Sequence, residues 1–261
     1  MRLSTLLLPA TLFLSGTAHA QARPEKPVIV LVHGAFAESA SWEPVITRLE
    51  KDGYTVIAAA NPLRSVASDG AAVSAVVKSI KGPVVLVGHS YGGPVITEAA
   101  NGNPNIKALV YVAGFAPETG ESSFSLSGKF PGSTLGEALT AYPVSTGGNE
   151  FVIRPEAFHH QFAADVSAEQ AALMAATQRP VTEVALTDGL PTATPAWKSL
   201  PSWFVISDQD LNIPFAAHRF FAERAGSRGT REVAGGSHAL SVSQPGPVAA
   251  SILDAVEAVS R

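Results

Sequence analysis

The feature that most constrains the fold is an alternation between short runs that are apolar throughout and longer segments with helical spacing. Val28–Val32 and Ile106–Val112 are apolar along almost their whole length, whereas Ser41–Lys51 places Trp42 and Leu49 on one helical face. A strand that is apolar at every position is buried on both faces, and strands that are each followed by a helix form a parallel sheet. The pattern predicts an α/β fold with a mainly parallel sheet of about six strands flanked by helices.

The rest of the alternation follows the same two patterns. The expected strands are Val28–Val32, Thr55–Ala59, Pro83–Val87, Ile106–Val112, Trp203–Ser207 and Thr230–Val233. The expected helices are Ser41–Lys51, Ser68–Ile80, Pro94–Ala100, Phe215–Ala225 and Val248–Val259. The length of the chain fits one sizeable domain of this kind.

Residues 117–199 interrupt the alternation. They are rich in Gly, Pro, Ser and Ala, and they contain helical pieces near Pro155–Ala164 and Ala168–Gln178. Long connections without regular structure are rare in compact domains unless they serve a functional site. We therefore expect a helical cap inserted into the domain rather than a second domain.

The first twenty residues have the composition of a secretory signal peptide. Arg2 is their only charged residue, a short Leu-rich run extends from Leu6 to Leu14, and small residues flank His19 at the end. We expect cleavage after Ala20, a domain over residues 21–261, and an exported protein, either periplasmic or secreted. No later stretch has the length of a membrane span, so no membrane contact is expected after cleavage.

Composition narrows the possible partners and cofactors. The formal net charge is −4, and a mildly acidic surface argues against a nucleic-acid partner. The chain has no Cys, so packing rather than disulfides must stabilise it. The seven His show none of the spacing of a zinc motif. We expect neither a metal nor a cofactor.

The sharpest local motif is the G-x-S-x-G sequence from Gly88 to Gly92, which places Ser90 at its centre. Glycines are needed around the serine because the turn from strand to helix is tight and the serine backbone is strained. A convincing strand precedes the motif and a helical segment follows it, which is the context that the motif requires. Ser90 is therefore the predicted nucleophile, and the backbone NH of Tyr91 is a predicted oxyanion donor at the helix N-terminus.

A second oxyanion donor should come from the loop after the first strand. Gly34 allows the backbone of this loop to approach the nucleophile closely. The NH of Ala35 is the preferred donor, and the NH of Phe36 is the next candidate.

The base and the acid should follow the nucleophile, with the base last. His238 comes after the last expected strand, in a Gly-rich loop at the edge of the sheet where catalytic groups gather. His33 and His89 flank loops that already have structural roles, and His218 lies on an expected helix. Asp208 and Asp210 both follow the preceding strand, and their spacing does not choose between them as the acid.

Taken together, these motifs resemble the α/β-hydrolase superfamily over residues 27–260. The likeness is greatest to the branch of bacterial carboxylesterases that is related to plant methylesterases and hydroxynitrile lyases. The motifs that carry it are His33-Gly34-Ala35 followed by Trp42, the GHS-x-GG sequence around Ser90, the D-x-x-I-P sequence from Asp210 to Pro214, and Gly236-x-His238. The resemblance favours Asp210 over Asp208 as the acid.

The resemblance also implies an activity, the hydrolysis of a carboxylic ester through an acyl-enzyme on Ser90. The few charges near the motifs indicate a small, largely apolar ester. The lyases of the branch carry a Thr at the place of Gly34 and a Lys at the place of Ala239, which disfavours a lyase. The alternatives are a hydroxynitrile-lyase-like activity, a cofactor-free perhydrolase activity, and a ligand-binding receptor on the same fold. The aromatic residues considered for the substrate pocket are Phe124, Phe130, Phe158, Phe162 and Trp197.

Overall fold

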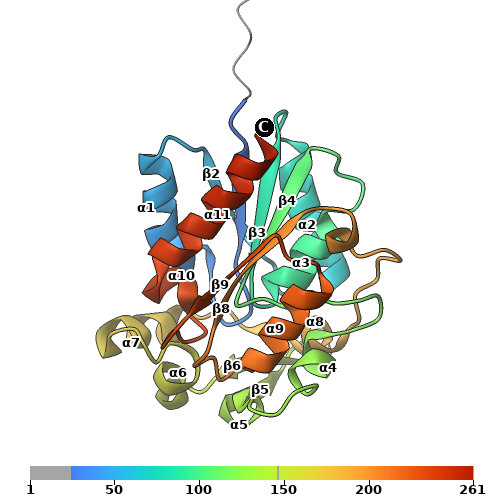
Figure 1. The fold of residues 1–261 in the computed structure, drawn as a ribbon. Helices are drawn as coiled ribbons and strands as arrows, with labels where there is room; N and C mark the ends of the chain where they lie inside the picture. The colour runs from blue at the N-terminus through green and yellow to red at the C-terminus, as the bar shows by residue number, and fades with distance from the viewer. Residues whose placement is uncertain (1–24, 146, 261) are drawn as a thin grey trace, which may run out of the picture.

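A computed structural model of the protein describes residues 25–145 and 147–260, so the predicted signal peptide lies outside the described residues. The body of the molecule is built on a six-stranded sheet in which every neighbouring pair of strands is parallel (Figure 1). Its strands, in order across the sheet, are β2 (Val56–Ala59), β1 (Val28–Val32), β3 (Val84–His89), β4 (Ile106–Val112), β8 (Ser202–Ser207) and β9 (Gly229–Val233). The predicted α/β class and parallel sheet are confirmed.

Helices cover both faces of this sheet, as continuously apolar strands require. One face carries α1 (Glu43–Lys51) and α11 (Pro245–Val259), and the other carries α2 (Val66–Lys78), α3 (Gly92–Ala99) and α9 (Phe215–Arg224). Successive side chains of a strand point to opposite faces. In β3, Val85 and Val87 accordingly pack toward α1 and α11, whereas Val84 and Leu86 pack toward α2 and α3.

Local interactions explain where the observed elements depart from the expected bounds. Helix α2 begins two residues early because the Ser65 side chain accepts a hydrogen bond from the NH of Ser68 and caps the helix at that point. Strand β3 extends to His89 because the ladder with β4 continues to the pair His89 and Val112. The short elements η1 (Ser39–Trp42), η2 (Ala196–Lys198) and α10 (Leu240–Ser243) were not expected.

The segment between β4 and β8 lies over the carboxyl ends of the sheet strands, at the lower end of the molecule in Figure 1. Its helices are α4 (Ser123–Ser127), α5 (Leu135–Ala138), α6 (Pro155–Phe162), α7 (Ala168–Thr177) and α8 (Glu183–Thr187). We call this segment the cap. In the described part of the chain, no helix is both long enough and apolar enough to cross a membrane.

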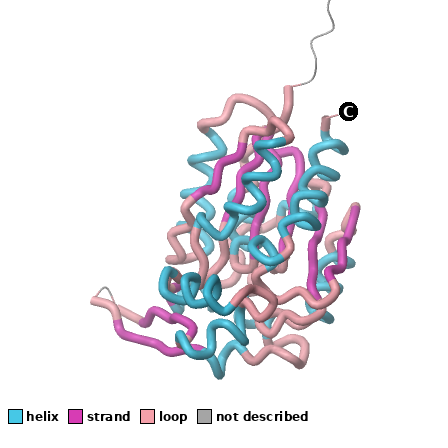
Figure 2. Tube along the Cα trace, turned by 90° about the vertical axis from the view of Figure 1, so that its left-hand side faces the viewer, coloured by secondary structure: helices cyan, strands magenta, loops and turns pink. Residues whose placement is uncertain are grey.

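The cap is not purely helical, which corrects the expectation of a helical cap. It contains a three-stranded antiparallel sheet of β5 (Leu139–Pro143), β6 (Asn149–Ile153) and β7 (Val181–Thr182). Figure 2 shows the β5–β6 hairpin reaching away from the body at the lower left. The sequence pattern missed β5 and β6 because polar residues interrupt both strands and most of their residues are not buried, so neither is apolar throughout.

The tightest packing of the body occurs where β3 turns into α3. A Cβ atom on Gly93 would lie 2.1 Å from the carbonyl oxygen of Phe115, and one on Gly92 would lie 2.6 Å from that of Val32. Both neighbours are backbone atoms, which cannot move aside as a flexible side chain can. The glycines therefore allow α3 to begin directly against the backbones of β1 and of the chain after β4.

The substitution Gly93→Ala is expected to lower the free energy of unfolding by about 1–3 kcal/mol, because the added methyl group overpacks a contact between two backbones. Urea unfolding monitored by circular dichroism would measure the change. The matched control is Gly136→Ala in α5, where an added Cβ meets nothing within 4 Å and should cost no stability. Equal stability of the two variants would contradict this account of the turn.

Candidate active site

Ser90 occupies the sharp turn between β3 and α3. Its φ of 54° lies in the left-handed region, which non-glycine residues rarely adopt. The main chain holds this conformation: the NH of Ser90 donates to the Val112 carbonyl at 3.1 Å, and its own carbonyl accepts from the NH groups of Gly93 and Phe115 at 2.9 and 3.3 Å. The turn thus places the Ser90 side chain at the carboxyl end of the sheet, under the cap.

The structure brings together three of the residues singled out in the sequence. The Nε2 atom of His238 lies 2.8 Å from the Ser90 hydroxyl oxygen, and its Nδ1 atom lies 2.7 Å from Asp210 Oδ2. Asp208 does not take part in these hydrogen bonds. Its carboxylate instead accepts a hydrogen bond from the NH of Gly235 at 2.7 Å. The loop geometry therefore separates two aspartates that spacing alone could not.

The Asp210 carboxylate is buried and accepts hydrogen bonds on both oxygens. Oδ1 accepts from the NH groups of Asn212 and Ile213 at 2.8 and 2.9 Å, and Oδ2 lies against His238 and His218. Burial on its own would raise the pKa of Asp210. The charge of His238 and the hydrogen bonds from His218 and His238 outweigh burial, so the pKa of this carboxyl lies far below its usual range. Asp210 is therefore a carboxylate anion.

His218 was assigned to a helix and given no role at the site, yet its Nε2 atom lies 3.0 Å from Asp210 Oδ2. Its side chain is fully buried, and its Nδ1 atom has no hydrogen-bond partner in the part of the chain that the structure describes. A sequence signal for this contact exists. His218 stands one turn into α9, and helical side chains lean back toward the helix N-terminus, where the Asp210 loop joins α9.

His33 and His89 support the site without contacting Ser90 through their ring nitrogens. His33 donates from Nδ1 to the Gly34 carbonyl and accepts at Nε2 from the NH of Asn61. His89 donates from Nε2 to the His238 carbonyl at 2.9 Å. Burial is the main cause that lowers the pKa of His33 to about 4, and burial followed by the charge of His238 lowers that of His89 to about 3. Both rings are therefore neutral near pH 7, and the hydrogen bond that His33 Nε2 accepts from Asn61 requires a neutral ring at His33.

The predicted oxyanion donors lie around Ser90. Among the described residues, no acceptor receives a hydrogen bond from the NH of Tyr91, Ala35 or Phe36, and all three residues line the cavity beside Ser90. A Cβ on Gly34 would lie 2.7 Å from Ser90 Cβ, so glycine lets this loop approach the serine. Unpaired NH groups beside a hydroxyl can stabilise an oxyanion that forms there.

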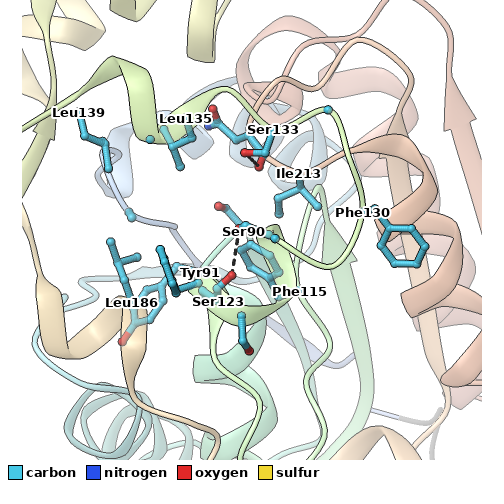
Figure 3. Close-up of a pocket in the computed structure, with 18 of the residues that line it drawn as sticks. Ser90, Tyr91, Phe115, Ser123, Phe130, Ser133, Leu135, Leu139, Leu186 and Ile213 are labelled. Carbon is cyan, nitrogen blue, oxygen red and sulfur yellow. Dashed lines mark hydrogen bonds between the residues drawn. The ribbon is translucent and has the colours of Figure 1, made fainter.

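A cavity of about 520 Å³ opens beside Ser90, between the body and the cap. Figure 3 shows Ser90 surrounded by Phe115, Leu135, Leu139 and Leu186 of the segment between β4 and β8 and by Tyr91 and Ile213 of the body. Of the aromatic residues considered for it, Phe124 and Phe130 line the cavity. Phe158, Phe162 and Trp197 instead belong to the buried hydrophobic core, so packing explains them better.

No group of three or more His, Asp or Glu is placed to hold a metal ion within residues 25–145 and 147–260. The polar groups at the cavity include the Ser90 hydroxyl, with the His238 ring behind it, the free backbone NH groups and the buried hydroxyl of Ser123. Such a set can present a nucleophile to a carbonyl, accept its proton and hold the resulting negative charge.

Comparisons with known proteins agree with this geometry. Residues 29–251 match the model of a family described as the alpha/beta hydrolase family. A carbendazim-hydrolyzing esterase of Nocardioides sp. strain SG-4G is 32% identical over 110 residues, which make up 37% of this chain and 46% of that esterase. This likeness therefore spans about half the length of that relative.

Two solved structures have the same fold at low sequence identity. The crystal structure of polyneuridine aldehyde esterase superposes with a TM-score of 0.75 at 22% identity, over 88% of this chain and 99% of that one. A methylesterase from Arabidopsis superposes with a TM-score of 0.70 at 20% identity, again over 88% and 99%. The family match confirms the predicted resemblance to the α/β-hydrolase superfamily, and both solved structures share its fold.

The two lowered histidine pKa values predict that acid destabilises the fold. Between pH 6.5 and about 4, the unfolded chain binds protons at His33 and His89 that the folded chain does not bind. Stability is therefore greatest above pH 6.5 and falls as the pH falls, by about 1.4 kcal/mol per pH unit for each group. The low pKa of Asp210 adds to this loss in stronger acid, because its contribution to stability is complete only above the unfolded pKa and is lost as the pH falls below it.

Urea unfolding at several pH values would measure this slope. The variant His33→Gln, which keeps a donor and an acceptor, should have a slope lower by about 1.4 kcal/mol per pH unit. The same change at the exposed His160 should leave the slope as it is. A wild-type stability that stays constant from pH 6.5 to 5 would rule out the buried neutral state of both rings.

Proposed function

Because this chain belongs to the alpha/beta hydrolase family, we propose that it is a carboxylic ester hydrolase that works through an acyl-enzyme on Ser90. The observation that carries the proposal is the continuous line of hydrogen bonds from Ser90 through His238 to Asp210 at 2.8 and 2.7 Å. A serine, an imidazole and a buried carboxylate in this order are the groups that acyl transfer requires. The esterase names of its relatives point in the same direction.

In the first half of the proposed reaction, Ser90 Oγ attacks the ester carbonyl while His238 Nε2 accepts the hydroxyl proton. The Asp210 carboxylate faces Nδ1 of the same ring, so it favours the tautomer that leaves Nε2 free to accept, and it stabilises the imidazolium that forms. The NH groups of Tyr91 and Ala35 would hold the negative oxygen of the tetrahedral intermediate. His238 then protonates the leaving alcohol, and an acyl-enzyme remains.

In the second half, water takes the place of the alcohol. His238 accepts a proton from the water as it attacks the acyl carbonyl, and the same NH groups hold the second oxyanion. Collapse of this intermediate returns the proton to Ser90 and releases the carboxylic acid. The strained turn at Ser90 keeps the hydroxyl in one position through both halves.

The proposed substrate is a largely apolar ester, and the lining of the cavity supports this choice. In the described part of the chain, no charged side chain lines it. Several of its serines are already satisfied by the protein: Ser127 Oγ donates to the Ser123 carbonyl, and Ser133 Oγ donates to that of Asn212. With a volume of about 520 Å³, the cavity has the size of a typical small-molecule pocket and accommodates more than an acetyl group.

The variant Ser90→Ala should lose about 10⁶-fold in kcat, because no other group replaces the nucleophile. Steady-state hydrolysis of p-nitrophenyl esters of short and medium chain length, by wild type and variant, would test this. The chain-length profile of the wild type would also report the size of the acyl pocket. If both proteins turned over equally, or if neither did, the proposal of a serine esterase would be wrong.

Substitutions of Asp210 and Asp208 provide a matched pair of variants that tests which aspartate is the acid. The variant Asp210→Asn should lose on the order of 10⁴-fold in kcat, because the amide favours the wrong tautomer of His238. The variant Asp208→Asn should keep most of the activity, since its Oδ1 binds only the loop NH of Gly235 and an Asn oxygen can accept the same bond. A larger loss for Asp208→Asn than for Asp210→Asn would reverse the assignment of the acid.

A further inference from the structure

One carboxylate oxygen serves two buried histidines in this molecule. Asp210 Oδ2 lies 2.7 Å from Nδ1 of His238 and 3.0 Å from Nε2 of His218. The first histidine contacts Ser90, whereas the second comes from α9 and does not line the cavity. The reaction proposed above uses only the first of them.

The hydrogen-bond partners of His218 determine which of its ring nitrogens carries a proton. An ionised carboxylate only accepts hydrogen bonds, so His218 must carry a proton on Nε2 and donate it. In the described residues its Nδ1 atom has no acceptor or donor, and the side chain is fully buried. The neutral ring with its proton on Nε2 makes the one available bond and avoids placing a second charge where no acceptor can reach it.

A hydrogen bond from a buried histidine to the carboxylate changes how strongly the carboxylate stabilises an imidazolium at His238. The negative charge of Asp210 is shared among all its donors, and Oδ1 is already taken by the NH groups of Asn212 and Ile213. Each further donor to Oδ2 weakens the attraction that the carboxylate can offer to an imidazolium at His238. Without His218, His238 would be the only donor to that oxygen.

Resting on the function proposed above, we propose that His218 is a positioning residue. It fixes the Asp210 carboxylate and shares its Oδ2 with His238, so that His238 becomes a free base at a lower pH than it otherwise would. The consequence is an esterase whose activity persists further into mildly acidic conditions. This effect acts through Asp210, because His218 contacts neither Ser90 nor the cavity.

Other titratable groups lie around this pair, and they are the same in every variant of position 218. Asp165 of the cap accepts a hydrogen bond from the hydroxyl of Ser237, next to His238. His89 faces the His238 ring from the end of β3, with ring centroids 4.8 Å apart, and it is held neutral by burial. Arg219 follows His218 on α9, but it lies at the surface in a two-bond ion pair with Glu232 of β9. Such an exposed pair is screened by solvent and contributes little to a buried ring.

The competing explanation is that His218 only fills space between α9 and the Asp210 loop. The variants His218→Gln and His218→Met separate the two. Both side chains have a similar length and volume, but the Gln amide can donate from the position of Nε2, whereas the Met thioether cannot. A packing role treats them alike, and a role through the hydrogen bond does not.

The test is the pH dependence of kcat/KM for p-nitrophenyl butyrate in wild type and both variants, after thermal unfolding shows that each variant is folded. The acidic limb reports the protonation of the base in the free enzyme. We expect His218→Gln to keep the wild-type limb. We expect His218→Met to move it to higher pH by about half to one unit, which is a roughly three- to tenfold loss of kcat/KM below the limb. Equal limbs in the two variants would overturn the proposal.

A second measurement needs neither turnover nor a change at position 218. Nitrogen NMR of the histidine rings in the Ser90→Ala protein, recorded at neutral pH, should show His218 protonated on Nε2 and His238 protonated on Nδ1. A His218 ring protonated only on Nδ1 would overturn the proposal even if Met at that position prevents folding. Because this readout is independent of ester hydrolysis, failure of the esterase function and failure of the His218 role are distinguishable.

Discussion

The structure depends on close backbone contacts at the turn that carries Ser90. Here β3, α3, the loop after β1 and the chain after β4 approach one another more closely than side chains would allow. Gly34 faces Ser90, and Gly93 faces Phe115, so each glycine is a place where one backbone rests on another. The positive φ of Ser90 persists because these contacts and the hydrogen bond to Val112 over-determine it.

The active site also depends on the Asp210 carboxylate. It is a buried charge, and buried charges are tolerated only when donors surround them. Its donors come from its own loop, from the loop of His238 and from α9, so one anion connects three separate parts of the chain. The hydrogen bonds that stabilise this charge also orient each donor. They explain why the His238 ring faces Ser90.

Much of this arrangement could be predicted from the sequence, because the strongest patterns are local. Continuous apolar runs gave the sheet strands to within a residue or two, and the glycines around Ser90 located the turn. The spacing of Asp208 and Asp210 could not choose the partner of His238, since two residues in a tight loop point in different directions according to its fold. The small sheet of the cap was missed because its strands are not apolar throughout, and the contact of His218 was missed although its place one turn into α9 indicated it.

The order of the sheet has a consequence for how the molecule reaches its active form. Ser90 follows β3, whereas Asp210 and His238 belong to the half of the sheet formed by β8 and β9, and 148 residues separate Ser90 from His238. The two halves join along the ladder between β4 and β8, and α11 packs back against α1, β3 and β4. Closing so long a loop is entropically costly and belongs to the slow, non-local steps of folding. Catalytic competence therefore requires that the two halves have joined, and activity reports that they have.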